Sequence, residues 1–260
     1  MALVCTGGIL MKIALIAPSG LSQYTELGDM HFIVPGYSSK KFYATETKFK
    51  MLDNGAWEYG EAINTDILLD WAKTCRVQEI VLPDVLMNKQ QTLLRSADFI
   101  STLTDKQKRY YSWAYVPQGK NLEEWIEAYK LATKTEWKID TLCLPKWLES
   151  KYHARAKVIS YLKGRELWDY RPHHLFGLDS LSEFFTIDPK GIRSVDSAKP
   201  ITYAYHKVTL PLWESPHLVR PSGGSKPRKI MDQYVAQNTS LFRFYANWRE
   251  NARRLVDHSI

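Results

Sequence analysis

The chain has little cysteine and no long apolar segment. Only 3 of its 260 residues are cysteines (Cys5, Cys75 and Cys143), and no two of them have the spacing of zinc ligands or of a disulfide framework. This scarcity indicates a reducing, cytoplasmic setting. No apolar run approaches the roughly 18 residues that a membrane span requires, and the first residues lack the basic region of a signal peptide. We therefore expect no membrane partner.

Several catalytic motifs are absent as well. No Gly-x-Gly-x-x-Gly or Walker-type loop follows the first strand-like run, which argues against a nucleotide-cofactor fold. The chain also has no Gly-x-Ser-x-Gly elbow, no His-Glu-x-x-His and no zinc-type Cys/His cluster, so we expect no metal and no cofactor. His173 and His174 are adjacent, and on a strand they point to opposite faces. We interpret them as structural.

What the sequence does contain is a regular alternation. Strand-like runs cover residues 12–18, 31–36, 49–55, 79–86, 110–119, 139–147, 173–179 and 192–200, and helix-like runs cover 63–75, 89–103, 121–134, 150–164 and 181–187. Alternation with short links predicts a parallel sheet covered by helices. The expected fold class is α/β, a (β/α)8 TIM-like barrel with an irregular last unit. An open doubly wound sheet is the alternative.

We divide the chain into three parts: an N-terminal extension (1–10), a barrel domain (11–219), and a basic loop with a C-terminal helix (220–260). From His217 onward there are eight Lys or Arg against three Asp or Glu, a surplus of five within the net charge of +7. Such a segment attracts polyanions, although a solvated helix surface explains it too. The candidates for contact with a nucleic-acid backbone are Arg220, Lys226, Arg228, Lys229, Arg249 and Arg253.

Nearly every strand-like run ends in a polar group beside a turn residue. These ends are Asp53-Asn54-Gly55, Pro83-Asp84, Pro117-Gln118-Gly119, Leu144-Pro145-Lys146, Gly177-Leu178-Asp179 and Asp196-Ser197. In a parallel barrel all of them lie on the face where barrel active sites are built. Each end alone is explained as a turn former or a helix cap. Their repetition predicts an active-site rim.

The chemistry that this rim offers is that of carboxylates. The acidic residues at the strand ends are Asp53, Asp84, Asp179 and Asp196. Two carboxylates that face one pocket suit substitution at the anomeric carbon of a sugar. One attacks the carbon and the other moves protons, through an oxocarbenium-like transition state.

In order and spacing, these motifs resemble the tRNA-guanine transglycosylase superfamily, and most closely its short phage-type members that insert 7-deazaguanines into DNA. The resemblance covers about residues 48–205 and rests on "LDNGAWE", "LPDVL", "VPQG", "LCLPKWL", "HHLFGLDS" and "IRSVDSAKP". It implies Asp196 as the nucleophile and Asp53 as the general base. The base-binding set that it implies is Asn54, Asp84, Gln118, Gly119, Leu144 and Pro145. Trp57 or Tyr59 is a candidate for stacking on the base, with hydrophobic packing as the alternative.

The chain departs from the tRNA enzymes in two ways. They carry a Cys-x-Cys-x-x-Cys…His zinc site after the barrel, whereas no Cys follows Cys143 here, so the zinc subdomain is missing and the chain is shorter. In addition, "LCLPKWL" stands where the family has Gly-Gly-Leu. These differences favour DNA as the partner, with the basic C-terminal segment contacting the backbone in place of the zinc unit.

The implied reaction exchanges a guanine, flipped out of DNA, for a free 7-deazaguanine base such as the 7-cyano form. Three other functions stay open at this point. The first is the same exchange on tRNA. The second is a glycosidase that releases a base without inserting another. The third is a nucleic-acid-binding module that acts through its basic tail alone.

Overall fold

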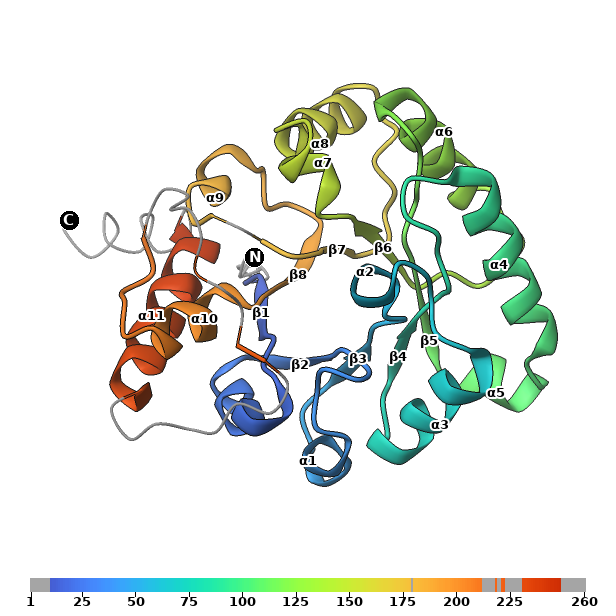
Figure 1. The fold of residues 1–260 in the computed structure, drawn as a ribbon. Coiled ribbons are helices and arrows are strands. Elements are labelled where there is room, and N and C mark those ends of the chain that lie inside the picture. Colours follow the sequence, from blue (N-terminus) through green and yellow to red (C-terminus); the bar gives the residue numbers. More distant parts are fainter. Residues whose placement is uncertain (1–9, 179, 212–217, 219–220, 223–230, 249–260) are drawn as a thin grey trace, which may run out of the picture.

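The computed structural model describes residues 10–178, 180–211, 218, 221–222 and 231–248. Within them, eight parallel strands close into a barrel in sequence order, with β8 paired back to β1 (Figure 1). The strands are β1 (Lys12–Leu15), β2 (Met30–Ile33), β3 (Lys50–Leu52), β4 (Glu79–Val81), β5 (Ser112–Tyr115), β6 (Thr141–Leu144), β7 (His173–Leu175) and β8 (Ile192–Ser197). The expected barrel is therefore confirmed, and the open-sheet alternative is wrong.

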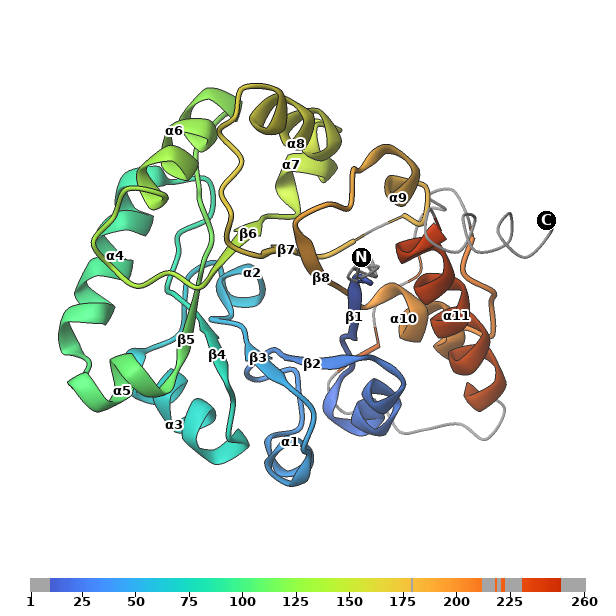
Figure 2. The same cartoon turned by 180° about the vertical axis from the view of Figure 1, so that it is seen from behind.

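The helices surround the barrel, as the views from both ends show (Figures 1 and 2). They are the 3-10 helix η1 (Ser19–Leu27) and the α-helices α1 (Lys40–Thr45), α2 (Ala56–Tyr59), α3 (Thr65–Cys75), α4 (Lys89–Thr102), α5 (Asp105–Tyr110), α6 (Leu122–Ala132), α7 (Trp147–Ser150), α8 (Arg155–Gly164), α9 (Glu183–Thr186), α10 (Lys199–Tyr205) and α11 (Met231–Ala246). Each expected helix has a counterpart among them. The helices η1, α1, α2, α5, α7 and α10 were not expected; all but η1 have fewer than two turns, too few to show a clear period.

The strands are buried on both faces, which explains why they read as unbroken apolar runs. Successive side chains alternate between the inside of the barrel and the helical layer. On β1, for example, Ala14 belongs to the inner core, whereas Ile13 and Leu15 pack in the outer one. The inner core consists mainly of Ala14, Ile16, Met30, Phe32, Val34, Met51, Val81, Ala114, Val116 and Cys143.

Asparagine caps fix where the main helices begin after the strands. The side chains of Asn64, Asn88 and Asn121 accept hydrogen bonds from backbone N–H groups in the first turns of α3, α4 and α6. Each cap satisfies a donor that the helix itself leaves unpaired.

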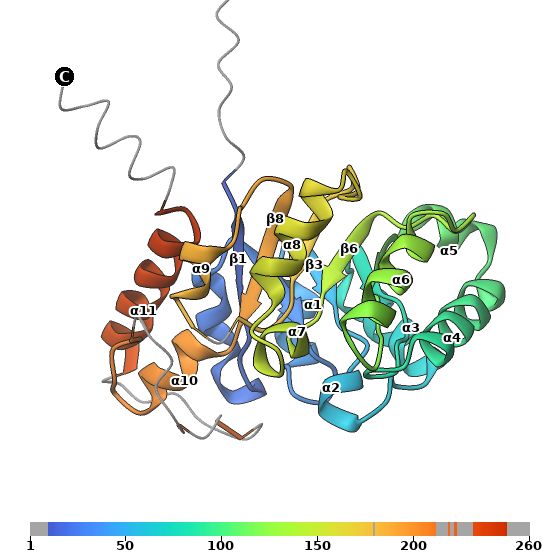
Figure 3. The same cartoon turned by 90° about the horizontal axis from the view of Figure 1, so that it is seen from above.

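The described part of the C-terminal region belongs to the helical layer. α11 packs against α10 and β1, and it buries Val235 and Phe242 (Figure 3). The Asn247 side chain accepts a hydrogen bond of 2.8 Å from the Met11 backbone N–H. The basic candidates Arg220, Lys226, Arg228, Lys229, Arg249 and Arg253 lie outside the described residues, as do residues 1–9 and Asp179. Among the helices that the structure describes, none combines the length and apolar character of a membrane span.

Candidate active site

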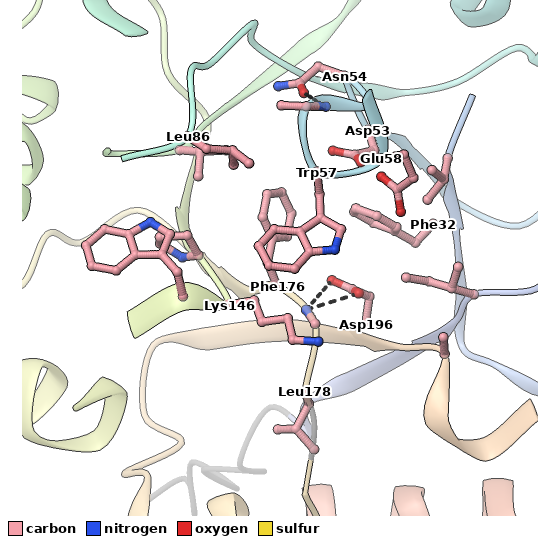
Figure 4. Close-up of a pocket in the computed structure, with 18 of the residues that line it drawn as sticks. Phe32, Asp53, Asn54, Trp57, Glu58, Leu86, Lys146, Phe176, Leu178 and Asp196 are labelled. Atoms are coloured by element: carbon pink, nitrogen blue, oxygen red, sulfur yellow. Dashed lines mark hydrogen bonds between the residues drawn. The ribbon is translucent and has the colours of Figure 1, made fainter. Parts of the chain in front are cut away.

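A pocket of about 260 Å³ opens at the carboxyl ends of the strands. Its walls are mostly apolar, and polar side chains converge on it from several strand ends (Figure 4). The apolar walls are formed by Ile16, Phe32, Val34, Leu86, Val116, Trp147, Phe176 and Leu178. A cavity of about 150 Å³ is enough to hold benzene. This one therefore has room for a bicyclic base.

Most of the strand ends that the sequence singled out meet at this pocket. Seven of the residues that the sequence singled out line the pocket: Asp53, Asn54, Trp57, Asp84, Gln118, Pro145 and Asp196. Tyr59, Gly119 and Leu144 do not line it. The sequence therefore found most of the polar groups of the pocket, and three of its candidates are placed elsewhere.

Each of those three residues has a structural explanation. Gly119 lies against the start of α6, where an added Cβ would be 2.5 Å from the Trp125 backbone nitrogen, so no side chain fits. Leu144 is fully buried in the outer core. The Tyr59 hydroxyl donates a hydrogen bond of 3.1 Å to the Pro35 carbonyl. These contacts belong to packing and loop geometry.

The loop after β3 delivers several side chains to the pocket, among them Asp53, Trp57 and Glu58. Gly55 has a φ of +79° and is the N-cap of the single-turn helix α2. This left-handed conformation favours glycine and turns the chain sharply back over the barrel. Asp53 directly follows the strand, and Trp57 and Glu58 extend from α2 into the same space (Figure 4).

Asp84 is buried and held by two amide side chains. Asn54 Nδ2 donates to Asp84 Oδ1 at 2.6 Å, and Gln118 Nε2 donates to Asp84 Oδ2 at 2.5 Å. Burial raises the pKa of Asp84 to about 6, and these two hydrogen bonds limit the rise. The carboxyl group is therefore mostly ionised at pH 7, with its orientation fixed.

The two amides are themselves fixed by groups of the barrel. Asn54 uses its second N–H on the Leu82 carbonyl at 2.7 Å, so both of its donors are occupied. Gln118 Oε1 accepts from the Met87 backbone N–H at 2.9 Å and from the Trp147 indole at 2.8 Å. Gln118 therefore keeps one N–H that these contacts do not use, whereas Asn54 positions Asp84 and has no N–H for a ligand.

Asp196 is buried on the opposite side of the pocket, near the end of β8. Its Oδ1 lies 2.9 Å from His174 Nε2, and it accepts from the Gly177 backbone N–H at 3.2 Å. Its Oδ2 accepts from the same N–H at 3.1 Å. Oδ2 thus has the fewer partners, and it is the oxygen better placed to react with a bound molecule.

His174 is a site residue that the sequence reasoning missed, because both histidines of β7 were interpreted as structural. The two side chains do point to opposite faces. His173 stacks on Trp168 outside the barrel, and the His174 ring lies inside, stacked on Phe32 with centroids 5.4 Å apart. His174 Nδ1 is 2.8 Å from Ser194 Oγ, so the ring is held at both nitrogens.

Asp53 differs from the other two aspartates. Burial raises its pKa well above the ordinary range, and repulsion from Glu58, Asp84 and Asp196 raises it further. The backbone N–H of Asn54 offsets this only in part. Asp53 is therefore a carboxylic acid that holds its proton at pH values where an ordinary aspartate has lost it. Glu58 was not expected from the sequence.

Two lysines and an indole line the mouth of the pocket. Trp57 is 52% exposed, and Lys146 Nζ lies 5.6 Å from the centroid of its ring. Lys199 enters the lining from the start of α10. The mouth thus combines an accessible aromatic face with positive charge, which suits a planar group attached to an anion.

Comparison with known proteins adds no family to this description. No protein-family model matches the chain, and no curated protein matches it.

Proposed function

We propose that the chain is a DNA-guanine transglycosylase, which replaces guanine in DNA with a 7-deazaguanine base through a covalent intermediate on Asp196. One observation carries the proposal. Across a single base-sized pocket, Asp196, held by His174 and the Gly177 backbone N–H, faces Asp53, whose pKa burial raises well above the ordinary range. Base exchange needs a nucleophile and a proton donor in this arrangement. The resemblance of the strand-end motifs assigns the same two residues.

The proposed reaction has two displacement steps. In the first, Asp196 Oδ2 forms a bond to C1′ of the nucleotide while the bond from C1′ to the guanine nitrogen breaks. The electron pair goes to that ring nitrogen, which takes the Asp53 proton. In the second, the incoming base gives its ring proton back to Asp53, and its nitrogen attacks C1′ and releases Asp196. The proton and the carboxylate are both restored, so no cofactor is consumed.

Asp84 and Gln118 supply the recognition of the base in this proposal. The ionised Asp84 accepts hydrogen bonds, and the edge shared by guanine and 7-deazaguanines presents N–H donors. Gln118 offers its remaining N–H to an acceptor on the same base. Because both side chains are held by interior hydrogen bonds, they meet the base without reorganising.

Two features support binding to a nucleic acid, and a third favours DNA over tRNA. Lys146 and Lys199 line the mouth, where the phosphates of a flipped nucleotide would pass. No cysteine follows Cys143, so the chain has none of the cysteines with which the tRNA enzymes bind zinc after the barrel. The net charge of +7 supports binding to a polyanion.

The decisive test follows labelled guanine into nucleic acid. Wild-type protein is incubated with labelled guanine and either duplex DNA or tRNA, and the label that enters the polymer is measured. We expect incorporation into DNA, and a loss of at least about 10⁴-fold with Asp196→Asn, because a nucleophile is removed. Asp98→Asn changes an exposed aspartate on α4 and serves as the matched control, with unchanged incorporation.

The same assay distinguishes the alternatives. Incorporation into tRNA but not DNA would assign the tRNA reaction. Release of a base with an abasic product, and no incorporation, would identify a glycosidase. Incorporation that Asp196→Asn leaves unchanged would refute the covalent mechanism. A covalent protein–DNA product, trapped by denaturation in the absence of an incoming base, provides a second readout of the nucleophile.

A further inference from the structure

A second cluster of ionisable side chains lies away from the pocket, near the amino-terminal ends of β2 and β3. Glu26 is close to the end of η1, His31 is in β2, and Glu46 directly follows α1. One nitrogen or oxygen atom of each lies within 4.8 Å of those of the other two. His31 Nε2 is 3.4 Å from Glu26 Oε1 and 3.6 Å from Glu46 Oε2.

The His31 ring is fully buried and directed at the two carboxylates. Thr25 Oγ1 lies 3.3 Å from Nδ1, and the Tyr43 ring packs edge-on at 5.1 Å. These contacts fix the ring with Nε2 facing the cluster. Nε2 makes no hydrogen bond of acceptable geometry with any residue that the structure describes. A buried nitrogen without a hydrogen bond lowers the stability of the fold, so its position indicates a ligand that binds there.

The spacing of the cluster matches a metal site. Ligand bonds of about 2.0–2.2 Å around tetrahedral zinc place neighbouring donor atoms about 3.4 Å apart. The two distances from His31 are close to this value. One imidazole nitrogen with two carboxylate oxygens is a donor set that suits Zn²⁺ and other divalent transition metals.

The neighbouring Lys48 does not occupy the metal position. Its Nζ donates to the backbone carbonyls of Glu26 and Gly28, the latter at 2.9 Å, and lies 3.5 Å from Glu26 Oε2. The other oxygen, Glu26 Oε1, faces His31 Nε2 at 3.4 Å, and the Glu26 side chain also interacts with that of Glu46. Lys48 therefore orients the Glu26 carboxylate and leaves Oε1 for a second cation.

We propose that Glu26, His31 and Glu46 bind one divalent transition-metal ion, with water completing its coordination. The site joins η1, β2 and the segment before β3, at the end of the barrel opposite the pocket. At that end of a barrel, specific interactions serve stability and not catalysis. The side chains of Glu26 and Glu46 are 39% and 20% exposed, so an ion reaches the site from solvent.

The test uses the untagged full chain after dialysis against a chelator, with Zn²⁺ as the probe. We expect calorimetric titration to show one Zn²⁺ per chain and Zn²⁺ to raise the Tm. Glu26→Gln and Glu46→Gln should each weaken binding at least tenfold, because losing even an outer-shell partner costs about 10–100-fold. Glu123→Gln, at an exposed glutamate of α6, is the matched control and should bind as the wild type does.

Two results of the Zn²⁺ titration would overturn the proposal. One is a wild-type chain that takes up no Zn²⁺. The other is binding that both glutamate variants leave unchanged, since the ion would then be held by other groups. Co²⁺ gives an independent readout, because its absorption spectrum reports the ligands directly. We expect a tetrahedral Co²⁺ spectrum in the wild type that Glu46→Gln abolishes, and a hexa-aqua spectrum in the wild type would also reject the site.

Discussion

The two sides of the pocket hold their carboxylates by different means. On the side of β3 to β5, Asp84 is bound by the amides of Asn54 and Gln118, one to each oxygen. On the side of β7 and β8, Asp196 is bound by the His174 ring and a backbone N–H, and most of these contacts fall on one oxygen. Side chains of the same type therefore have different hydrogen-bond partners on the two sides of the pocket.

In the proposed reaction, this difference separates recognition of the base from bond formation. A carboxylate with both oxygens held in a plane presents a fixed hydrogen-bonding edge, which suits Asp84. A carboxylate with one oxygen anchored and the other less constrained can form a bond, which suits Asp196. Asp53 belongs to neither arrangement. Burial, and then repulsion from its neighbours, raise its pKa, as a proton donor requires.

The first prediction concerns that proton. Asp53→Asn should lower kcat by about 10²–10⁴-fold, the usual contribution of general acid–base catalysis. The raised pKa fixes the sign of the pH dependence. Asp53 is protonated and active as an acid below its pKa in the folded protein, so kcat/KM should fall as pH rises through that value. The measurement is the exchange rate against pH.

Asp53→Asn should also lose this fall in kcat/KM at high pH, the alkaline limb of the pH profile, since asparagine does not titrate. Asp66→Asn, at an exposed aspartate of α3, is the control and should keep both the rate and the limb. A wild-type-like alkaline limb in Asp53→Asn would show that another group supplies the proton.

The second prediction tests the histidine on the Asp196 side. His174→Phe keeps a ring against Phe32 but removes the partner of Asp196 Oδ1. We expect kcat to fall about 10²-fold, because the nucleophile is no longer held in position. KM should change little, since His174 does not line the pocket. His174→Gln retains a side-chain N–H and should recover part of kcat.

A merely structural role for His174 predicts something else. The Tm would then fall in His174→Phe while kcat stayed at the wild-type level. Formation of the covalent protein–DNA product separates the two explanations, because only a positioning role slows that step.

The sequence predicted the carboxylates better than the groups around them. The sequence sufficed to predict Asp53, Asp84 and Asp196, because parallel strands bring their carboxyl ends to one face, whatever the exact pairing. His174 was missed because its contact depends on register. It pairs with Ser194 only after an irregularity between His173 and His174, and no sequence pattern reveals that shift.

Local geometry explains the other differences. Glu58 was missed because α2 has a single turn, too short for any period to show which side chains turn inward. Tyr59 is two residues from Trp57 and so points elsewhere on the same turn. Gly119 was selected beside Gln118, but its lack of a side chain serves the packing of α6. In each case tertiary contacts decide, and these are not local in the chain.

The third prediction compares the stabilities of variants at Asp84 and at Asp53. At pH 5 Asp84, with a pKa of about 6, is mostly protonated and still accepts from both amides. Asp84→Asn places an NH₂ group against one of those donors, and it should lower the free energy of unfolding by about 1–3 kcal/mol. Asp53→Asn should gain less over the wild type at pH 5 than at pH 8, since pH 5 is only slightly above the pKa of an aspartate in the unfolded chain. Urea unfolding gives both values.

At pH 8 the free energy of unfolding of Asp53→Asn should be higher than that of the wild type. A carboxyl group whose pKa is raised on folding loses stability as pH rises from its unfolded pKa to its folded one. Asparagine has no such loss, so Asp53→Asn should exceed the wild type by about 1–2 kcal/mol. Equal stabilities of Asp53→Asn and the wild type at both pH values would mean that Asp53 is not strained by its neighbours.

The smallest effect is expected at the mouth, where two aromatic residues of one short helix are compared. Trp57 lines the pocket beside Lys146, whereas the Tyr59 hydroxyl is bound to Pro35. Stacking on a base contributes about 1–3 kcal/mol, so Trp57→Leu should raise KM for DNA about tenfold with little change in kcat. Tyr59→Phe keeps the ring and loses only a loop hydrogen bond, so KM should stay constant. If Tyr59→Phe raised KM as much as Trp57→Leu, the loop of α2 as a whole, and not one ring, would bind the nucleotide.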